Sequence, residues 1–203
     1  MKKFLLIAAI IVMATAPVLS KNSDTTLRIK ELSEVIVLPI ETKTKIIGRQ
    51  SNRGSMRIKI EGDSAIGKEV GLKFKIKKRA WIKHVSFAIE ECDSMLTHMP
   101  FKLNIYNHQS KECTNNLVSS IEFVYSKEDM IDDRYTLSFP TPLQIEKGEY
   151  ILALEFCENF PSKKFLMPTG IMTGHTYFRN SSQSSWQKIP LGSTLAIEVE
   201  IVK

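Results

Sequence analysis

The sequence predicts an all-β protein, an antiparallel β-sandwich most simply of the jelly-roll type. Apolar and polar residues alternate along short runs, so that one face of each predicted strand is apolar. These runs recur roughly every 8 to 15 residues, with turn-forming residues between them, as in sandwiches and barrels. No long window has the apolar period of a helix.

The predicted core is organised around residues 67–105, which indicate three successive strands. On the first strand, apolar residues alternate with lysines: Leu72, Phe74 and Ile76 against Lys73, Lys75 and Lys77. The predicted inward sets of the next two strands are Trp81, Val85, Phe87 and Ile89, then Phe101, Leu103 and Ile105.

The other predicted strands cover residues 32–38, 56–60, 118–125, 134–139, 150–156, 164–167, 175–178 and 195–201. We expect Pro140 and Pro142 to end the strand at 134–139, since proline cannot donate to a β-ladder. Residues 164–167 and 175–178 read as two short strands separated by Pro168, Gly170 and Gly174.

The domain organisation follows from the N-terminal half. Residues 1–20 predict a signal peptide, because two lysines precede an apolar run too short to span a membrane. Cleavage is expected after Ser20, with Ala16 as the alternative. Residues 21–55 then form an N-terminal strand and polar linker, and residues 56–203 form the sandwich. We expect an exported protein of the periplasm, outer-membrane surface or medium, with no transmembrane span after cleavage.

The charge is only mildly basic. The chain has 28 basic and 22 acidic residues, and losing Lys2 and Lys3 lowers the net charge from +6 to +4. The lysines at 73–83 suit a solvated sheet face, with a patch for phosphate or anionic glycan as the alternative. Export and the lack of an aromatic and arginine module disfavour nucleic acid as a partner.

Several segments resemble a known group of proteins: Gly67-Lys68-Glu69-Val70-Gly71, Phe101-Lys102-Leu103-Asn104-Ile105-Tyr106, Ile151-Leu152-Ala153-Leu154-Glu155, Thr176-Tyr177-Phe178-Arg179-Asn180, and Trp186. They resemble poorly characterised exported Bacteroidota β-sandwich proteins, often found C-terminal to a carboxypeptidase-regulatory-like domain. The segment at 31–37 is similar to the tail of that domain, which is itself missing here. The resemblance implies a fold and an envelope setting, with no catalytic residues.

The three cysteines allow one disulfide in an exported chain. If successive strands alternate in direction, Cys92 and Cys157 lie at the same end of the sandwich, and we expect them to pair and leave Cys113 free. Three reduced thiols are the alternative. The spacing of the cysteines and histidines matches no compact zinc site, so we expect no metal and no cofactor.

No catalytic residue is expected. Acidic clusters at 90–93 and 128–133 lie at strand ends, where charged residues usually face solvent, although calcium binding is an alternative. No serine occupies a nucleophile elbow. We therefore predict a non-enzymatic envelope module with a structural or protein-binding role, and treat a hydrolase with an unrecognised site as less favoured. The oligomeric state is not predicted.

The alternative function is carbohydrate binding. Tyr177, Arg179, Asn180 and Trp186 surround a polar loop, and they combine rings that could stack on a sugar with groups that could bind its hydroxyls. Burial of the aromatic rings in the core is the competing interpretation. An envelope protein and a glycan are thus the two expected partners. Thr25, Ser64 and Ser94 lie in short patterns similar to Bacteroidota O-glycosylation sites.

Overall fold

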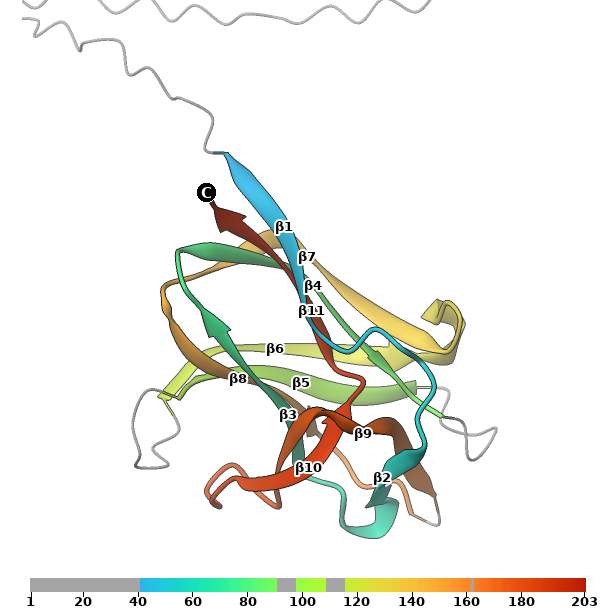
Figure 1. The fold of residues 1–203 in the computed structure, drawn as a ribbon. Coiled ribbons are helices and arrows are strands. Elements are labelled where there is room, and N and C mark those ends of the chain that lie inside the picture. Colours follow the sequence, from blue (N-terminus) through green and yellow to red (C-terminus); the bar gives the residue numbers. More distant parts are fainter. Residues whose placement is uncertain (1–40, 91–97, 109–115, 162) are drawn as a thin grey trace, which may run out of the picture. The chain divides into compact units, whose positions relative to one another are not determined.

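The computed structural model describes residues 41–90, 98–108, 116–161 and 163–203, which form two packed antiparallel β-sheets (Figure 1). The all-β sandwich is therefore confirmed, and the finer jelly-roll assignment stays a prediction. The elements are β1 (Thr42–Gly48), β2 (Met56–Glu61), η1 (Gly62–Ser64), β3 (Glu69–Ile76), β4 (Ala80–Ala88), β5 (His98–Asn107), β6 (Asn116–Ser126), η2 (Lys127–Asp129), β7 (Arg134–Ile145), β8 (Gly148–Phe156), β9 (Lys164–Arg179), β10 (Gln187–Ser193) and β11 (Ala196–Val202).

The smaller sheet has the strand order β1-β11-β4-β7. The larger sheet has the order β10-β9-β3-β8-β5-β6, with β2 paired to β9. Alternate residues of the two sheets point inward and fill the space between them, as the period of a strand requires. Aromatic rings from both sheets meet at Phe87, Phe101 and Phe156, each no more than 1% exposed.

The inward set of β4 differs from the prediction at Trp81. The structure buries Ala80, Ile82, Val85 and Phe87, and leaves Trp81 half-buried on the outer face. The registers of β4 with β7 and with β11 both shift next to Lys83. A bulge of this kind inserts one residue and reverses which side chains point inward, so alternation counted across it fails.

Strand β7 does not end at the prolines. It continues through Pro140 and Pro142 to Ile145, where the prediction ended it at Phe139. Among the described strands, β7 forms the edge of the smaller sheet, and the register of its pairing with β4 shifts between His84 and Ile82. Proline is tolerated there, because an edge strand needs ladder hydrogen bonds on one side only.

Three other elements differ from the prediction. Strand β1 lies where a polar linker was expected, and it pairs with β11 from Thr42 to Gly48. Strand β9 is continuous where two short strands were expected, and β10 was not predicted at all. These differences arise from tertiary pairing. Strand β1 gains its hydrogen bonds from β11, far along the chain, and β10 gains its hydrogen bonds from β9 across an irregular hairpin. The predicted strand at 32–38 lies outside the described residues.

Candidate functional site

The hairpin of β9 and β10 contains a large bulge. Ile171 pairs with Leu191 and Thr176 with Ile189, so residues 172–175 of β9 face Pro190 alone. Two bulge residues have left-handed backbone: Met172 has a φ of 59° and Gly174 one of 123°. Glycine adopts this conformation readily, whereas methionine is strained in it. Bulges that carry strain are frequent beside functional sites.

A cavity of about 400 Å³ opens beside the bulge, and we call it the bulge cavity. Its lining comes from the end of β1, the middle of β3, the bulge itself and the end of β10. Lys73 and Arg49 supply positive charge, Tyr177 supplies a half-buried ring, and Thr173 and His175 supply polar groups. Its volume falls in the range of small-ligand sites.

Two buried polar atoms in the lining residues lack a hydrogen-bond partner among the described residues: Nη1 of Arg49 and Oγ of Ser193. Ser193 is only 3% exposed. Leaving such a group unpaired costs about 1–3 kcal/mol, so proteins usually avoid it. Both atoms belong to residues that line the cavity.

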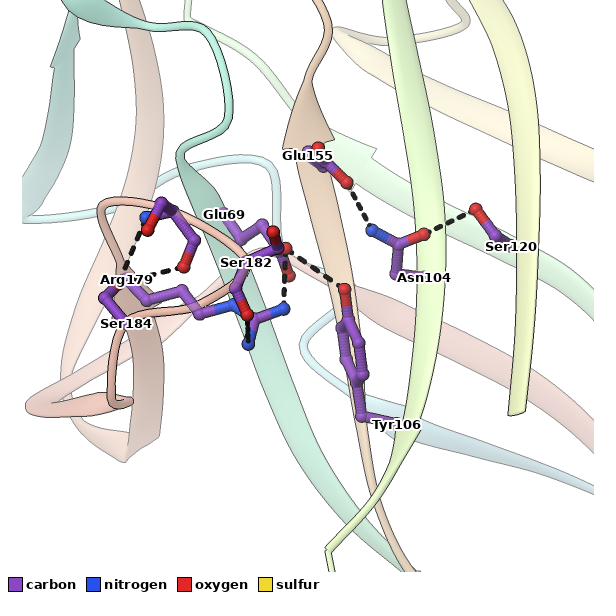
Figure 2. A network of polar contacts seen from close by, with 9 residues as sticks. Glu69, Asn104, Tyr106, Ser120, Glu155, Arg179, Ser182 and Ser184 are labelled. Atoms are coloured by element: carbon purple, nitrogen blue, oxygen red, sulfur yellow. Dashed lines mark hydrogen bonds and ion pairs between the residues drawn. The ribbon is translucent and has the colours of Figure 1, made fainter. Parts of the chain in front are cut away.

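A second polar cluster lies farther along β9, on the outer face of the larger sheet (Figure 2). Arg179 is 1% exposed, and its Nη2 lies 2.7 Å from Oε1 of Glu69, which is also fully buried. The Arg179 guanidinium lies 4.5 Å from the ring centre of Tyr106 and 4.2 Å from that of Trp186. Its Nη1 donates a hydrogen bond of 2.9 Å to the Ser182 carbonyl. We call this group the arginine cluster.

Burial controls the ionisation of the arginine cluster. Desolvation raises the pKa of the Glu69 carboxyl, although Arg179 and the Tyr106 hydroxyl oppose this shift. Desolvation also raises the pKa of the Tyr106 hydroxyl, which donates a hydrogen bond of 3.1 Å to Oε1 of Glu69. Oε2 of Glu69 has no partner among the described residues, which agrees with a carboxyl that is costly to ionise.

The neighbouring carboxyl of Glu155 is the cross-strand partner of Glu69. It accepts a hydrogen bond of 2.6 Å from Asn104, whose side-chain oxygen accepts another of 2.6 Å from Ser120 (Figure 2). Two adjacent carboxyls are the usual requirement for acid–base hydrolysis. Here, however, the Glu69 carboxyl is buried and bonded to Arg179 and Tyr106, so a substrate has no access to it.

The structure places the four predicted ligand-binding residues in different surroundings, although Tyr177 and Trp186 both pack against the buried cluster of Tyr106, Ile151 and Ala153. Tyr177 lines the bulge cavity, while Arg179 and Trp186 belong to the arginine cluster. Asn180 is exposed at the start of the loop. Trp186 is half-buried and lies over the outer face of the sheet, against Tyr106 and beside Gly71 of β3. Arg179, which the sequence predicted to bind sugar hydroxyls, pairs with Glu69.

The sequence did not identify Arg49 or Ser193, and it assigned Lys73 to a solvated face. Arg49 and Ser193 reach the cavity only because β1 and the end of β10 lie beside β9 and β3. The sequence did contain one indication of close packing at this hairpin: Gly170 and Gly192, which are cross-strand partners. A Cβ added at either would come within 2.6 Å of a Thr173 atom.

The remaining sequence predictions fall partly outside the described residues. Cys92, Cys113, Thr25 and Ser94 lie there, so the Cys92–Cys157 disulfide and two of the three glycosylation sites stay predictions. Cys157 is half-buried, and burial raises the pKa of its thiol. Ser64 is exposed, and its hydroxyl accepts a hydrogen bond from Lys68.

Within the described part of the chain, no three His, Cys, Asp or Glu residues form a group that could hold a metal. No helix among the described residues has the length and hydrophobicity needed to cross a membrane.

The chain is similar to solved structures only at a low level. No family model matches the chain, and no curated protein matches its sequence. A crystal structure of a protein from Sulfurospirillum deleyianum is similar at 13% identity and a TM-score of 0.30. The match covers 74% of this chain and 99% of that one. A likeness this weak gives no information about the ligand.

Proposed function

We propose that this protein is an exported, non-enzymatic β-sandwich module that binds a saccharide in the bulge cavity. The observation that carries the proposal is the pair of unpartnered polar atoms, Arg49 Nη1 and Ser193 Oγ, in residues that line the cavity beside the Tyr177 ring. Saccharides present hydroxyls to such atoms and a flat C–H face to an aromatic ring. The resemblance to exported Bacteroidota sandwiches supports the envelope setting.

A glycan-array screen of the purified protein tests the proposal, followed by titration calorimetry of the best ligand. Tyr177→Ala should weaken that binding at least about tenfold, because it removes the stacking surface. Trp81→Ala is the matched control, since Trp81 is a half-buried aromatic on the outer face of the other sheet. An affinity unchanged by Tyr177→Ala, or silence across the array, would contradict the proposal.

Ser193→Ala is the sharper test. Removing a hydroxyl that has no partner should leave the ligand-free protein as stable as before, or slightly more stable. The same change should weaken saccharide binding, because the ligand loses a hydrogen bond. A variant that loses stability and keeps its affinity would show that the hydroxyl serves the fold.

A second candidate function is protein binding, which the exposed apolar residues of β6 favour. Leu117, Val118 and Val124 are 53%, 48% and 55% exposed. Strand β6 ends the strand order of the larger sheet, so its outer edge offers unpaired backbone groups to a partner strand. Crosslinking in the native envelope tests this role, which predicts that Val124→Lys abolishes any crosslinked partner.

A further inference from the structure

A second cavity, of about 500 Å³, lies along the open side between the two sheets. Apolar residues line it together with six lysines: Lys43, Lys45, Lys75, Lys77, Lys78 and Lys203. We call this cavity and its lysines the lysine groove. Ile47 lines both this groove and the bulge cavity, so the two are neighbours along β1.

Strand pairing explains why the groove is open. β1 is the last strand of the smaller sheet, and β3 pairs with β9 only at residues 69–71. Beyond Gly71, the described structure pairs β3 with β8 alone. The edges of β1 and β3 thus border the groove without a strand between them.

The positive charge of the groove is only partly balanced. Glu149 pairs with Lys73 and Lys75, and Glu41 pairs with Lys203. For Lys43, Lys45, Lys77 and Lys78, the described part of the chain provides no ion pair. Like charges gathered around a hollow surface attract an anion and raise its local concentration.

Protection of strand edges does not account for all of these lysines. Lysine on an edge strand prevents edge-to-edge aggregation, and Lys43 and Lys45 of β1 fit that role. Lys77, Lys78 and Lys203, however, follow the ends of β3 and β11 and protect no ladder edge. Their gathering around one apolar hollow indicates a ligand.

We propose that the lysine groove binds the acidic groups of an anionic polysaccharide. This inference rests on the proposed function, because it extends the saccharide chain from the bulge cavity into the groove past Ile47. The lysines would pair with carboxylate or sulfate groups, while the apolar floor of Ile47, Ile201 and Val202 contacts the sugar rings. Arg49 extends the same positive charge into the bulge cavity.

The test compares polygalacturonate with its methyl-esterified form, which has the same backbone without the charge. The protein should bind the acid form at least about tenfold more tightly, and the preference should fall as salt rises. Lys43→Gln/Lys45→Gln/Lys77→Gln should weaken acid-form binding roughly tenfold, because each exposed ion pair contributes modestly. Lys127→Gln/Lys163→Gln/Lys164→Gln removes the same charge from η2 and the start of β9, and should retain affinity.

The outcomes separate the two proposals. If Tyr177→Ala abolishes binding and the groove variant leaves the preference for the acid form intact, the bulge cavity stands and the groove inference fails. If only the groove variant weakens binding, the groove stands and the saccharide site at Tyr177 is wrong. Equal binding of both probes, aggregation of the groove variant at full affinity, or binding only to phosphatidylglycerol vesicles would each overturn the groove inference.

Discussion

The arginine cluster and the bulge cavity differ although one strand builds both. Tyr177 and Arg179 lie two positions apart on β9 and therefore point to the same side of the sheet. The Arg179 guanidinium contacts the Glu69 carboxylate, the Ser182 carbonyl and the rings of Tyr106 and Trp186. Tyr177 pairs with Lys188 of β10 just beyond the bulge at residues 172–175, and it lines a cavity together with Arg49 and Ser193, whose buried atoms Nη1 and Oγ lack partners among the described residues.

The difference shows that two side chains close together in the sequence can have very different surroundings. The buried Arg179 guanidinium is held by the Glu69 carboxyl and the Ser182 carbonyl, so these contacts serve the folded state. The bulge cavity is an open space beside Tyr177, and its lining residues include Arg49 and Ser193, which each have a buried atom without a partner among the described residues. Tyr177 and Arg179 are only two positions apart in the sequence. Only their neighbours in the folded structure show that Tyr177 borders a cavity and that Arg179 is buried in an ion pair.

The largest expected effect is the loss of Arg179. Arg179→Met should lower the free energy of unfolding by about 3–5 kcal/mol, because it leaves the buried Glu69 carboxyl without its cation. Urea unfolding followed by tryptophan fluorescence measures this. Glu69→Leu/Arg179→Met removes both charges and should recover most of the stability. If the double variant is as unstable as the single one, the ion pair does not explain the cost.

Trp186→Ala should have the next largest effect, lowering the free energy of unfolding by about 2 kcal/mol. The ring is half-buried and covers the Arg179 guanidinium, so both packing and a cation–π contact are lost. Tyr177→Ala should cost less than about 1 kcal/mol, because its ring borders a cavity. Thermal melts measure both variants. If Tyr177→Ala were the more destabilising of the two, the assignment of Trp186 to the arginine cluster and of Tyr177 to the cavity would be contradicted.

Met172→Gly should raise the free energy of unfolding by up to about 1 kcal/mol. Met172 is 96% exposed and has a φ of 59°, so its side chain gains little packing and strains the backbone. Chemical denaturation measures the change. Met172→Ala is the control, since alanine keeps the strain and should leave stability nearly unchanged. Equal gains from glycine and alanine would indicate that the side chain, not the backbone, is unfavourable.

The smallest expected effect is a pH dependence from Glu69. Its pKa is raised in the folded state, so between its ordinary value near 4.5 and the raised value the folded protein binds more protons than the unfolded one. Stability contributed by the protonated carboxyl is therefore fully present below about pH 4.5 and is lost as pH rises. Urea midpoints from pH 4 to about pH 7 should show this slope, with Glu69→Gln lacking it. A slope of opposite sign would mean that Arg179 dominates the pKa of Glu69.

The fold class and most strands were predictable from the residues. Alternation placed β3, β5, β8 and β11 correctly, because their core contacts repeat with the period of a strand. The alternation of apolar and polar residues gave wrong predictions where a bulge or the position of a strand in its sheet changed the local structure. The bulge at Lys83 moved Trp81 to the outer face, and the edge position of β7 allowed Pro140 within the strand.

The candidate site was predictable only in part. Tyr177, Arg179 and Trp186 stood out because large aromatic and cationic side chains surround one polar loop. Their partners did not stand out: Glu69 is more than a hundred positions from Arg179, and it lies beside it because β3 pairs with β9. Arg49 was in a predicted linker.

The sequence alone therefore determined the alternating strands and the sandwich, since these depend on short-range periodicity and on burial of apolar faces. The tertiary structure decided which charged residue is buried with a partner and which residues line a cavity. Those properties depend on pairing between strands that are far apart in the sequence, and this pairing cannot be predicted from composition or residue spacing. Two arginines show this most clearly: Arg179 is buried against Glu69, whereas Arg49 lines the bulge cavity and has a buried nitrogen without a partner among the described residues.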